Sequence, residues 1–97
     1  MKERILYKKA VKHWGYPLQL GMAIEECAEL IQAINKVQRQ WDTDKMQEAV
    51  EHLADEVADV EIMMGQLRVM FDWFNFETKI NVRKHTKLKK LEDMLNG

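Results

Sequence analysis

The sequence predicts an all-α fold, an antiparallel four-helix bundle that oligomerises through its long central helices. Strand signals are nearly absent, because the chain has no alternating β-branched run and no Asn-Gly or Asp-Gly turn. Apolar residues instead recur every three or four positions, which is the period of one helix face. The 97 residues include one proline and four glycines. We therefore expect a single domain that spans residues 1–97.

Breakers and caps divide the chain into four helices. The first is expected over Lys2–Trp14, ended by the segment Gly15-Tyr16-Pro17, and the second from about Leu18 to Gln40. Asp44 followed by Gln47 matches a capping box, which begins a third helix that runs to about Phe71. The aromatic stretch Phe71–Phe76 leads into a fourth helix that ends near Leu95.

Apolar spacing predicts which faces of the two central helices pack together. The predicted seam consists of Ala23, Cys27, Leu30, Ile34 and Val37 on the second helix and of Val50, Leu53, Val57, Val60, Met64, Leu67 and Phe71 on the third. The third helix also carries Ile62, Met63, Val69 and Met70 at other angles. A monomer would expose them, so we expect a homodimer or homotetramer with the third helix at the interface.

Composition and charge narrow the class of protein. No apolar run is long enough for a membrane span, and the N-terminus has no signal-like apolar region, so we expect a cytoplasmic protein without a membrane partner. The lone Cys27 excludes an intramolecular disulfide and matches no zinc spacing. Acids dominate residues 25–61, and the two ends are basic, with a net charge of −1. A nucleic-acid partner is therefore not expected, although a basic last helix alone is compatible with one.

A short internal repeat is the most specific feature of the sequence. Residues 25–30, Glu-Glu-Cys-Ala-Glu-Leu, match residues 55–60, Asp-Glu-Val-Ala-Asp-Val. Residues three apart share a helix face, so Glu26 pairs with Glu29, and Glu56 with Asp59. Each pair directly precedes an apolar pair of the predicted seam, which places the carboxylates about 100° to its side. Antiparallel packing then lets both pairs flank one shallow cleft.

Four converging carboxylates repel each other unless they take up protons or hold a cation. Oxygen ligands suit Mg²⁺, with Mn²⁺ as a substitute, and such a metal supports phosphoryl chemistry. Either acidic pair alone would be an ordinary solvated helix face, and Glu25 and Asp55 fit solvent or supporting roles equally well. A di-iron carboxylate site is excluded, because no histidine follows an acid at a spacing of three.

The double motif, Glu25-Glu26-x-x-Glu29 and then Glu56-x-x-Asp59, resembles the signature of the MazG-like nucleoside triphosphate pyrophosphohydrolases. These belong to an all-α superfamily that includes the dimeric dUTPases, and the resemblance covers about Trp14 to Phe71. It implies an oligomeric four-helix core that holds Mg²⁺ through the four motif carboxylates, which are also its catalytic residues. It also implies hydrolysis of NTPs or dNTPs between the α and β phosphates, which yields a monophosphate and pyrophosphate.

The remaining candidate residues concern the substrate. The resemblance implies cations on the last helix that face the phosphates, and Lys79 and Arg83 lie in the comparable region. Gln19 and Lys36 lie about two turns from the carboxylates and are candidates for base or sugar and for phosphate, respectively. Surface solvation is the ordinary alternative for each of these four. For the whole chain, the alternative is a non-catalytic helical oligomer that acts as a regulator or assembly module.

Overall fold

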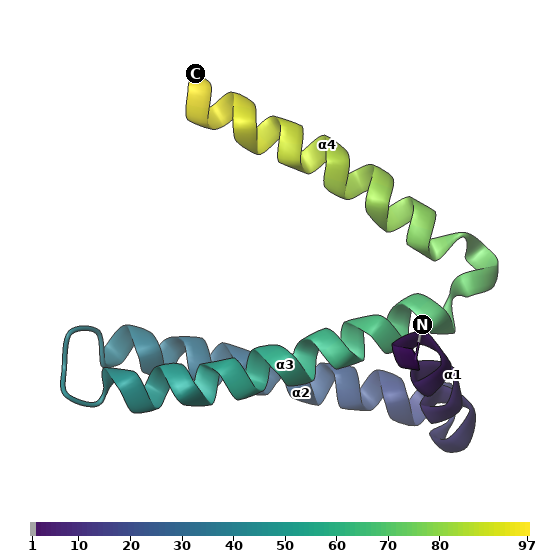
Figure 1. Cartoon of the computed structure of the whole chain (residues 1–97), viewed down its shortest axis with the longest axis horizontal. Helices are drawn as coiled ribbons and strands as arrows, with labels where there is room; N and C mark the ends of the chain where they lie inside the picture. The colour runs from purple at the N-terminus through teal and green to yellow at the C-terminus, as the bar shows by residue number, and fades with distance from the viewer. Residues whose placement is uncertain (1) are drawn as a thin grey trace.

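A computed structural model describes residues 2–97, and this part of the chain is helical almost throughout. Its elements in chain order are α1 (Lys2–Trp14), α2 (Tyr16–Arg39), α3 (Met46–Met70), the short 3-10 helix η1 (Asp72–Phe74) and α4 (Phe76–Asn96). Figure 1 shows α2 and α3 as a long antiparallel hairpin, with α1 across one end and α4 leading away from the same end. The all-α prediction is confirmed.

Glycine and proline set the junction between α1 and α2. Gly15 adopts a φ of 86°, a left-handed conformation that glycine reaches without a steric penalty, and α1 ends immediately before it. Pro17 lies in the first turn of α2, where its missing N–H costs no helical hydrogen bond. The second helix therefore begins at Tyr16, two residues before the predicted start at Leu18.

The loop between α2 and α3 differs from the predicted capping box. No side chain caps the N-terminus of α3 from Asp44 or from its N-cap residue Lys45. Thr43 instead organises the loop: its hydroxyl donates to the carbonyl oxygen of Gln40 at 2.8 Å and accepts from the backbone N–H of Lys45 at 3.2 Å. The hydroxyl satisfies backbone groups that a helix end leaves free, so the acid is not needed as a cap.

The buried face of α3 is rotated from the predicted seam by one residue. On α3 the buried residues include Ala49, Glu56, Met63 and Met70, each seven positions after the last. Val50 and Val57, which belong to the predicted seam, stay 43% and 39% exposed. On α2 the buried residues are Gln19, Ala23 and Ala33.

Small side chains explain this rotation. Alanines at 23, 33 and 49 bring the two helix backbones close together, which favours their face for the contact within one chain. The apolar residues one position later, Ile24, Ile34 and Val50, are left on the surface. The seam prediction is therefore wrong for Ile34, Val50, Val57 and Met64, which stay exposed. It is right for Ala23, which is buried, and Leu30, Leu53, Val60 and Leu67 are half-buried. Glu56 lies in the buried face rather than to the side of it, where the sequence had predicted it.

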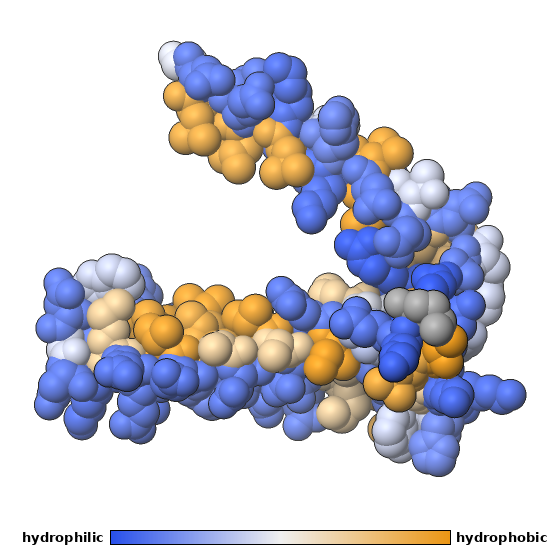
Figure 2. Space-filling model, in the orientation of Figure 1, coloured by the Kyte–Doolittle hydropathy of each residue, from blue (hydrophilic) through white to orange (hydrophobic). Residues whose placement is uncertain are grey.

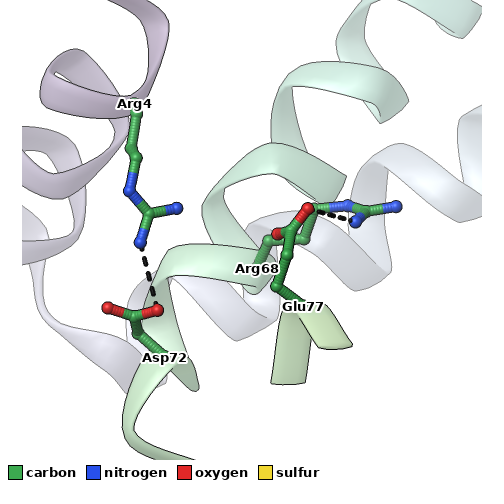
Figure 3. Close-up of polar contacts among 4 residues, drawn as sticks. All are labelled: Arg4, Arg68, Asp72 and Glu77. Atoms are coloured by element: carbon green, nitrogen blue, oxygen red, sulfur yellow. Dashed lines mark hydrogen bonds and ion pairs between the residues drawn. The ribbon is translucent and has the colours of Figure 1, made fainter. Parts of the chain in front are cut away.

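The first helix packs on α3 and, less extensively, on α2. The ring of Tyr7 lies directly over Gly65, where a Cβ would collide with it, so this glycine is what lets α1 approach α3. Two ion pairs join the elements at this end, as Figure 3 shows: Arg4 contacts Asp72 at 3.0 Å, and Arg68 contacts Glu77 at 2.9 Å. Both pairs are half exposed and contribute little to stability.

The last helix leaves the hairpin at an angle and has no buried residue of its own (Figure 1). Figure 2 shows hydrophobic side chains on the side of the hairpin that faces α4 and on the side of α4 that faces the hairpin. A four-helix bundle is therefore not closed within the single chain.

Among the helices that the structure describes, none combines the length and the hydropathy that a membrane span requires.

Candidate metal centre

Three carboxylates meet where α2 and α3 pack together. Glu26 and Glu29, one turn apart on α2, face Glu56 of α3, and one oxygen atom from each lies within 4.8 Å of the others. Helical spacing brings the first two together, and the antiparallel hairpin supplies the third. Glu56 is only 7% exposed, whereas Glu26 and Glu29 are half-buried.

Two of the oxygen atoms in this cluster are buried without a hydrogen-bond partner, Oε2 of Glu26 and Oε2 of Glu56. Buried carboxylate oxygens are costly when nothing compensates them, so nearly all in native proteins have a partner. Nor does any ion pair within residues 2–97 involve the three glutamates. Neither an ion pair nor a hydrogen bond within residues 2–97 therefore compensates these two buried oxygens.

Burial raises the pKa of Glu26 above its usual value of 4.5, and the charges of Glu29 and Asp59 raise it further. Burial also raises the pKa of Glu56, as do the charges of Glu29 and Asp59 and a hydrogen bond with Glu29, while the nearby His52 lowers it. Repulsion between like charges and desolvation thus act together against ionisation. A divalent cation would reverse both effects, since it replaces water around the oxygens and neutralises their charge.

The donor set fits a hard cation. Carboxylate oxygens with room for water ligands suit Mg²⁺ or Mn²⁺, and the absence of sulfur and imidazole from the cluster disfavours zinc. The two orphaned oxygens are the observation that distinguishes this cluster from an ordinary acidic helix face.

Asp59, the fourth predicted ligand, lies at the edge of the cluster. Its side chain is exposed, and it is not among the three residues whose oxygens lie within 4.8 Å of one another. It is still close enough to raise the pKa of both Glu26 and Glu56. The shorter aspartate side chain explains why it reaches less far into the helix interface than the glutamates do.

The structure places Gln19 inside the protein rather than on a substrate-binding surface. Its side chain is 4% exposed, and its amide nitrogen donates to Oε1 of Gln66 at 2.6 Å. Sequence reasoning missed Gln66, although its position between Met63 and Met70, at spacings of three and four, is a signal for the same helix face. Together the two amides form a neutral contact across α2 and α3.

The predicted phosphate-binding cations do not converge on the cluster within one chain. Lys36 is half-buried on α2. On α4, Lys79 donates to the carbonyl oxygen of Phe74 at 2.5 Å and Arg83 to that of Lys79 at 3.2 Å. Because α4 leads away from the hairpin (Figure 1), neither α4 side chain belongs to the acidic cluster of its own chain.

Comparison of the chain with protein-family models, with curated proteins and with solved structures gives no match.

Proposed function

We propose that the chain is a Mg²⁺-dependent nucleoside triphosphate pyrophosphohydrolase of the MazG-like type. The observation that carries the proposal is the cluster of Glu26, Glu29 and Glu56, in which one buried oxygen of Glu26 and one of Glu56 have no hydrogen-bond partner. These residues belong to the double motif whose resemblance to the MazG-like signature suggests the reaction. The substrate is an NTP or dNTP, and the role is housekeeping of the nucleotide pool.

Glu26, Glu29, Glu56 and Asp59 hold the metal in this proposal. When bound, Mg²⁺ neutralises phosphate charge and lowers the pKa of the water that attacks phosphorus. The carboxylates would hold the ion, and its positive charge would allow an anionic triphosphate to bind beside them. The bond that breaks joins the α and β phosphates, as the resemblance to the MazG-like signature implies. The absence of a Gly-x-x-x-x-Gly-Lys loop, of the kind that presents a γ phosphate, agrees with this choice.

The proposed enzyme works as a homodimer or homotetramer in the cytoplasm. Apolar side chains on the hairpin, such as Ile34, Val50 and Val57, stay exposed in the single chain, as do Leu88 and Leu91 on α4. Soluble monomers rarely expose apolar patches of this kind. When these apolar surfaces pack against a second copy of the chain, they complete the four-helix core that one chain leaves open, with α3 at the interface.

The oligomer also gives the basic residues a role. The α4 helix carries Lys79 and Arg83 on a segment that projects away from its own hairpin. In an assembly that covers the apolar side of α4, these cations and Lys36 are available to bind the phosphates of the substrate.

Phosphorus NMR of the products tests the reaction directly. A mixed pool of NTPs and dNTPs incubated with the protein and Mg²⁺ should yield monophosphates and pyrophosphate in equal amounts. EDTA should stop the reaction, and added Mg²⁺ or Mn²⁺ should restore it. Diphosphates and orthophosphate as the main products would overturn the proposed bond cleavage even if the metal dependence holds.

The exposed apolar surfaces fit a second candidate equally well, a non-catalytic helical oligomer that acts as a regulator or assembly module. Replacing Leu88 and Leu91 together with aspartate should reduce the particle to a monomer in analytical ultracentrifugation. The matched control replaces Thr78 and Thr86 with aspartate, which adds the same charge at exposed positions of the same helix outside the groove that Leu88 and Leu91 line. An oligomer that binds Mg²⁺ and turns over none of the nucleotides would favour the second candidate.

A further inference from the structure

A second concave site lies at the end of the molecule where α1, α2, α3 and η1 meet. This pocket has a volume of about 520 Å³, within the range of small-molecule sites. Its lining combines Val11 and Val69 with the aromatic rings of Tyr16 and Trp73 and with the side chains of Lys8 and Lys12. Apolar walls with a few charged groups are typical of a binding site for a small molecule.

The two aromatic rings leave a surface on which a planar ligand can stack. Tyr16 and Trp73 meet edge to face, with ring centroids 5.9 Å apart and planes at 64°. Tyr16 therefore does not stack flat on the indole, and neither does Phe74, whose ring lies at 5.6 Å with the planes at 50°. Trp73 remains 65% exposed. An indole left open on the wall of a cavity contributes little to the core and is suited to stack on a ring.

The charge of the pocket is positive and unbalanced. Lys8 and Lys12 lie one turn apart on α1, on the same helix face. Neither forms an ion pair with any residue from 2 to 97. The acid of the pocket wall, Asp72, is already paired with Arg4 at 3.0 Å (Figure 3). An anion is therefore the complementary ligand.

The pocket is separate from the acidic cluster. Tyr16 precedes Glu26 by ten residues of α2, which is about 15 Å along the helix at 1.5 Å per residue. Val69 follows Glu56 by thirteen residues of α3, or about 20 Å. None of the residues that line the pocket belongs to the carboxylate cluster.

We propose that this pocket binds a nucleoside monophosphate without a metal, with the base stacked on Trp73 and the phosphate held by Lys8 and Lys12. The ring and the anion of such a ligand match the two kinds of group that the pocket offers. The proposal stands independently of the proposed hydrolase activity, because it uses different residues and needs no Mg²⁺.

Titration of the full-length protein with AMP in EDTA tests the site, followed by the indole N–H signals in nitrogen-15 NMR. We expect saturable shifts of the Trp73 indole at millimolar AMP, and much weaker binding of adenosine and of inorganic phosphate. Equal affinity for either fragment, or no saturable shift, would overturn the proposal. So would an oligoadenylate that binds far more tightly than AMP, since the ligand would then be a nucleic acid.

Two variants and two matched controls locate the binding. Trp73→Ala should weaken AMP binding at least about fivefold, from stacking worth about 1–3 kcal/mol. Trp41→Ala removes an indole of similar exposure, 63%, from the α2–α3 loop and should leave affinity unchanged. Lys8→Gln with Lys12→Gln should weaken AMP but not adenosine, whereas the charge-matched control Lys2→Gln with Lys45→Gln should not.

Glu56→Gln separates this site from the acidic cluster. AMP affinity in EDTA should be the same in this variant as in the wild type. Loss of binding in Glu56→Gln would assign the AMP to the acidic cluster and refute the second site. Failure of the hydrolase assay together with intact AMP binding would refute only the proposed enzyme.

Discussion

Two polar contacts cross the interface between α2 and α3, and they differ in how well their groups are satisfied. Gln19 and Gln66 form a neutral pair, with donor and acceptor 2.6 Å apart. Glu26 follows Gln19 by seven residues on α2, and Glu56 precedes Gln66 by ten residues on α3. Each of these two glutamates keeps a buried oxygen without a partner. The neutral pair needs nothing more, whereas the carboxylates carry an electrostatic cost that a cation would offset. The first contact therefore stabilises the hairpin as it stands, and the second is the one that a bound cation would stabilise.

Removal of one charge from the carboxylate contact should have the largest effect. Glu56→Gln keeps the volume of the side chain and removes its charge. We expect turnover to fall at least about a hundredfold, or about 2.7 kcal/mol in activation free energy, if Glu56 holds the metal. Helical content by circular dichroism should not change, and the melting temperature in EDTA should stay equal or rise, because a repulsion is lost.

Glu51→Gln is the matched control for this substitution. Glu51 lies on the same helix, is exposed and is not part of the cluster. It should leave both turnover and melting unchanged. Full activity in Glu56→Gln would remove the metal site from the proposal.

Truncation of the neutral glutamine pair should have the opposite effect: it should lower the free energy of unfolding more than it affects metal binding. Gln66→Ala leaves the buried amide of Gln19 unpaired, which should cost about 1–3 kcal/mol in the free energy of unfolding. Urea denaturation measures this cost, and Gln47→Ala, an exposed glutamine of α3, should stay within about 0.5 kcal/mol of the wild type. Equal stability of the two variants would mean that the glutamine pair does not hold the helices together.

The sequence predicted the elements well because local signals determine them. Gly15 ends α1, and the polar loop around Thr43 ends α2, as both residue types imply. The grouping of Glu26, Glu29 and Glu56 was also predictable, since helical spacing and one hairpin suffice to bring them together.

The packing face and the direction of α4 were not predictable from local signals. Two rows one residue apart compete for the interface on α3, and Ala49 and Met63 are buried although Val50 and Met64 in the other row are no less apolar. For α4, the apolar row of the sequence predicts that some surface covers it, but not which chain provides that surface. The orphaned oxygens depend on this packing and were likewise visible only in three dimensions.

Two glycines inside helices extend the comparison from side chains to backbone. A methyl group on Gly65 would collide with the ring of Tyr7, whereas one on Gly21 meets no atom within 4 Å. Gly65→Ala should therefore cost about 1–3 kcal/mol from overpacking, partly offset by better helix propensity. Gly21→Ala should gain about 0.5–1 kcal/mol. Thermal melting should give opposite signs, and destabilisation of both variants alike would remove the special role of the Tyr7 contact.

The smallest expected effect is the dependence of stability on pH, which distinguishes the two polar contacts without a change in packing. The pKa values of Glu26 and Glu56 in the folded chain lie above the usual 4.5. At a pH between the usual 4.5 and the raised pKa of each glutamate, the folded chain binds more protons than the unfolded chain. The free energy of unfolding therefore rises as pH falls, and this stability is lost as pH rises through the folded pKa. In EDTA, the melting temperature of the wild type should therefore increase from pH 7 toward the ordinary range of a glutamate. Glu56→Gln should show a shallower increase and Gln66→Ala the same slope as the wild type, because a neutral amide does not titrate.

With Mg²⁺ present the slope should weaken or reverse, since the metal binds the ionised carboxylates in competition with protons. Identical slopes in the wild type and Glu56→Gln would show that burial of the cluster does not couple its protonation to folding.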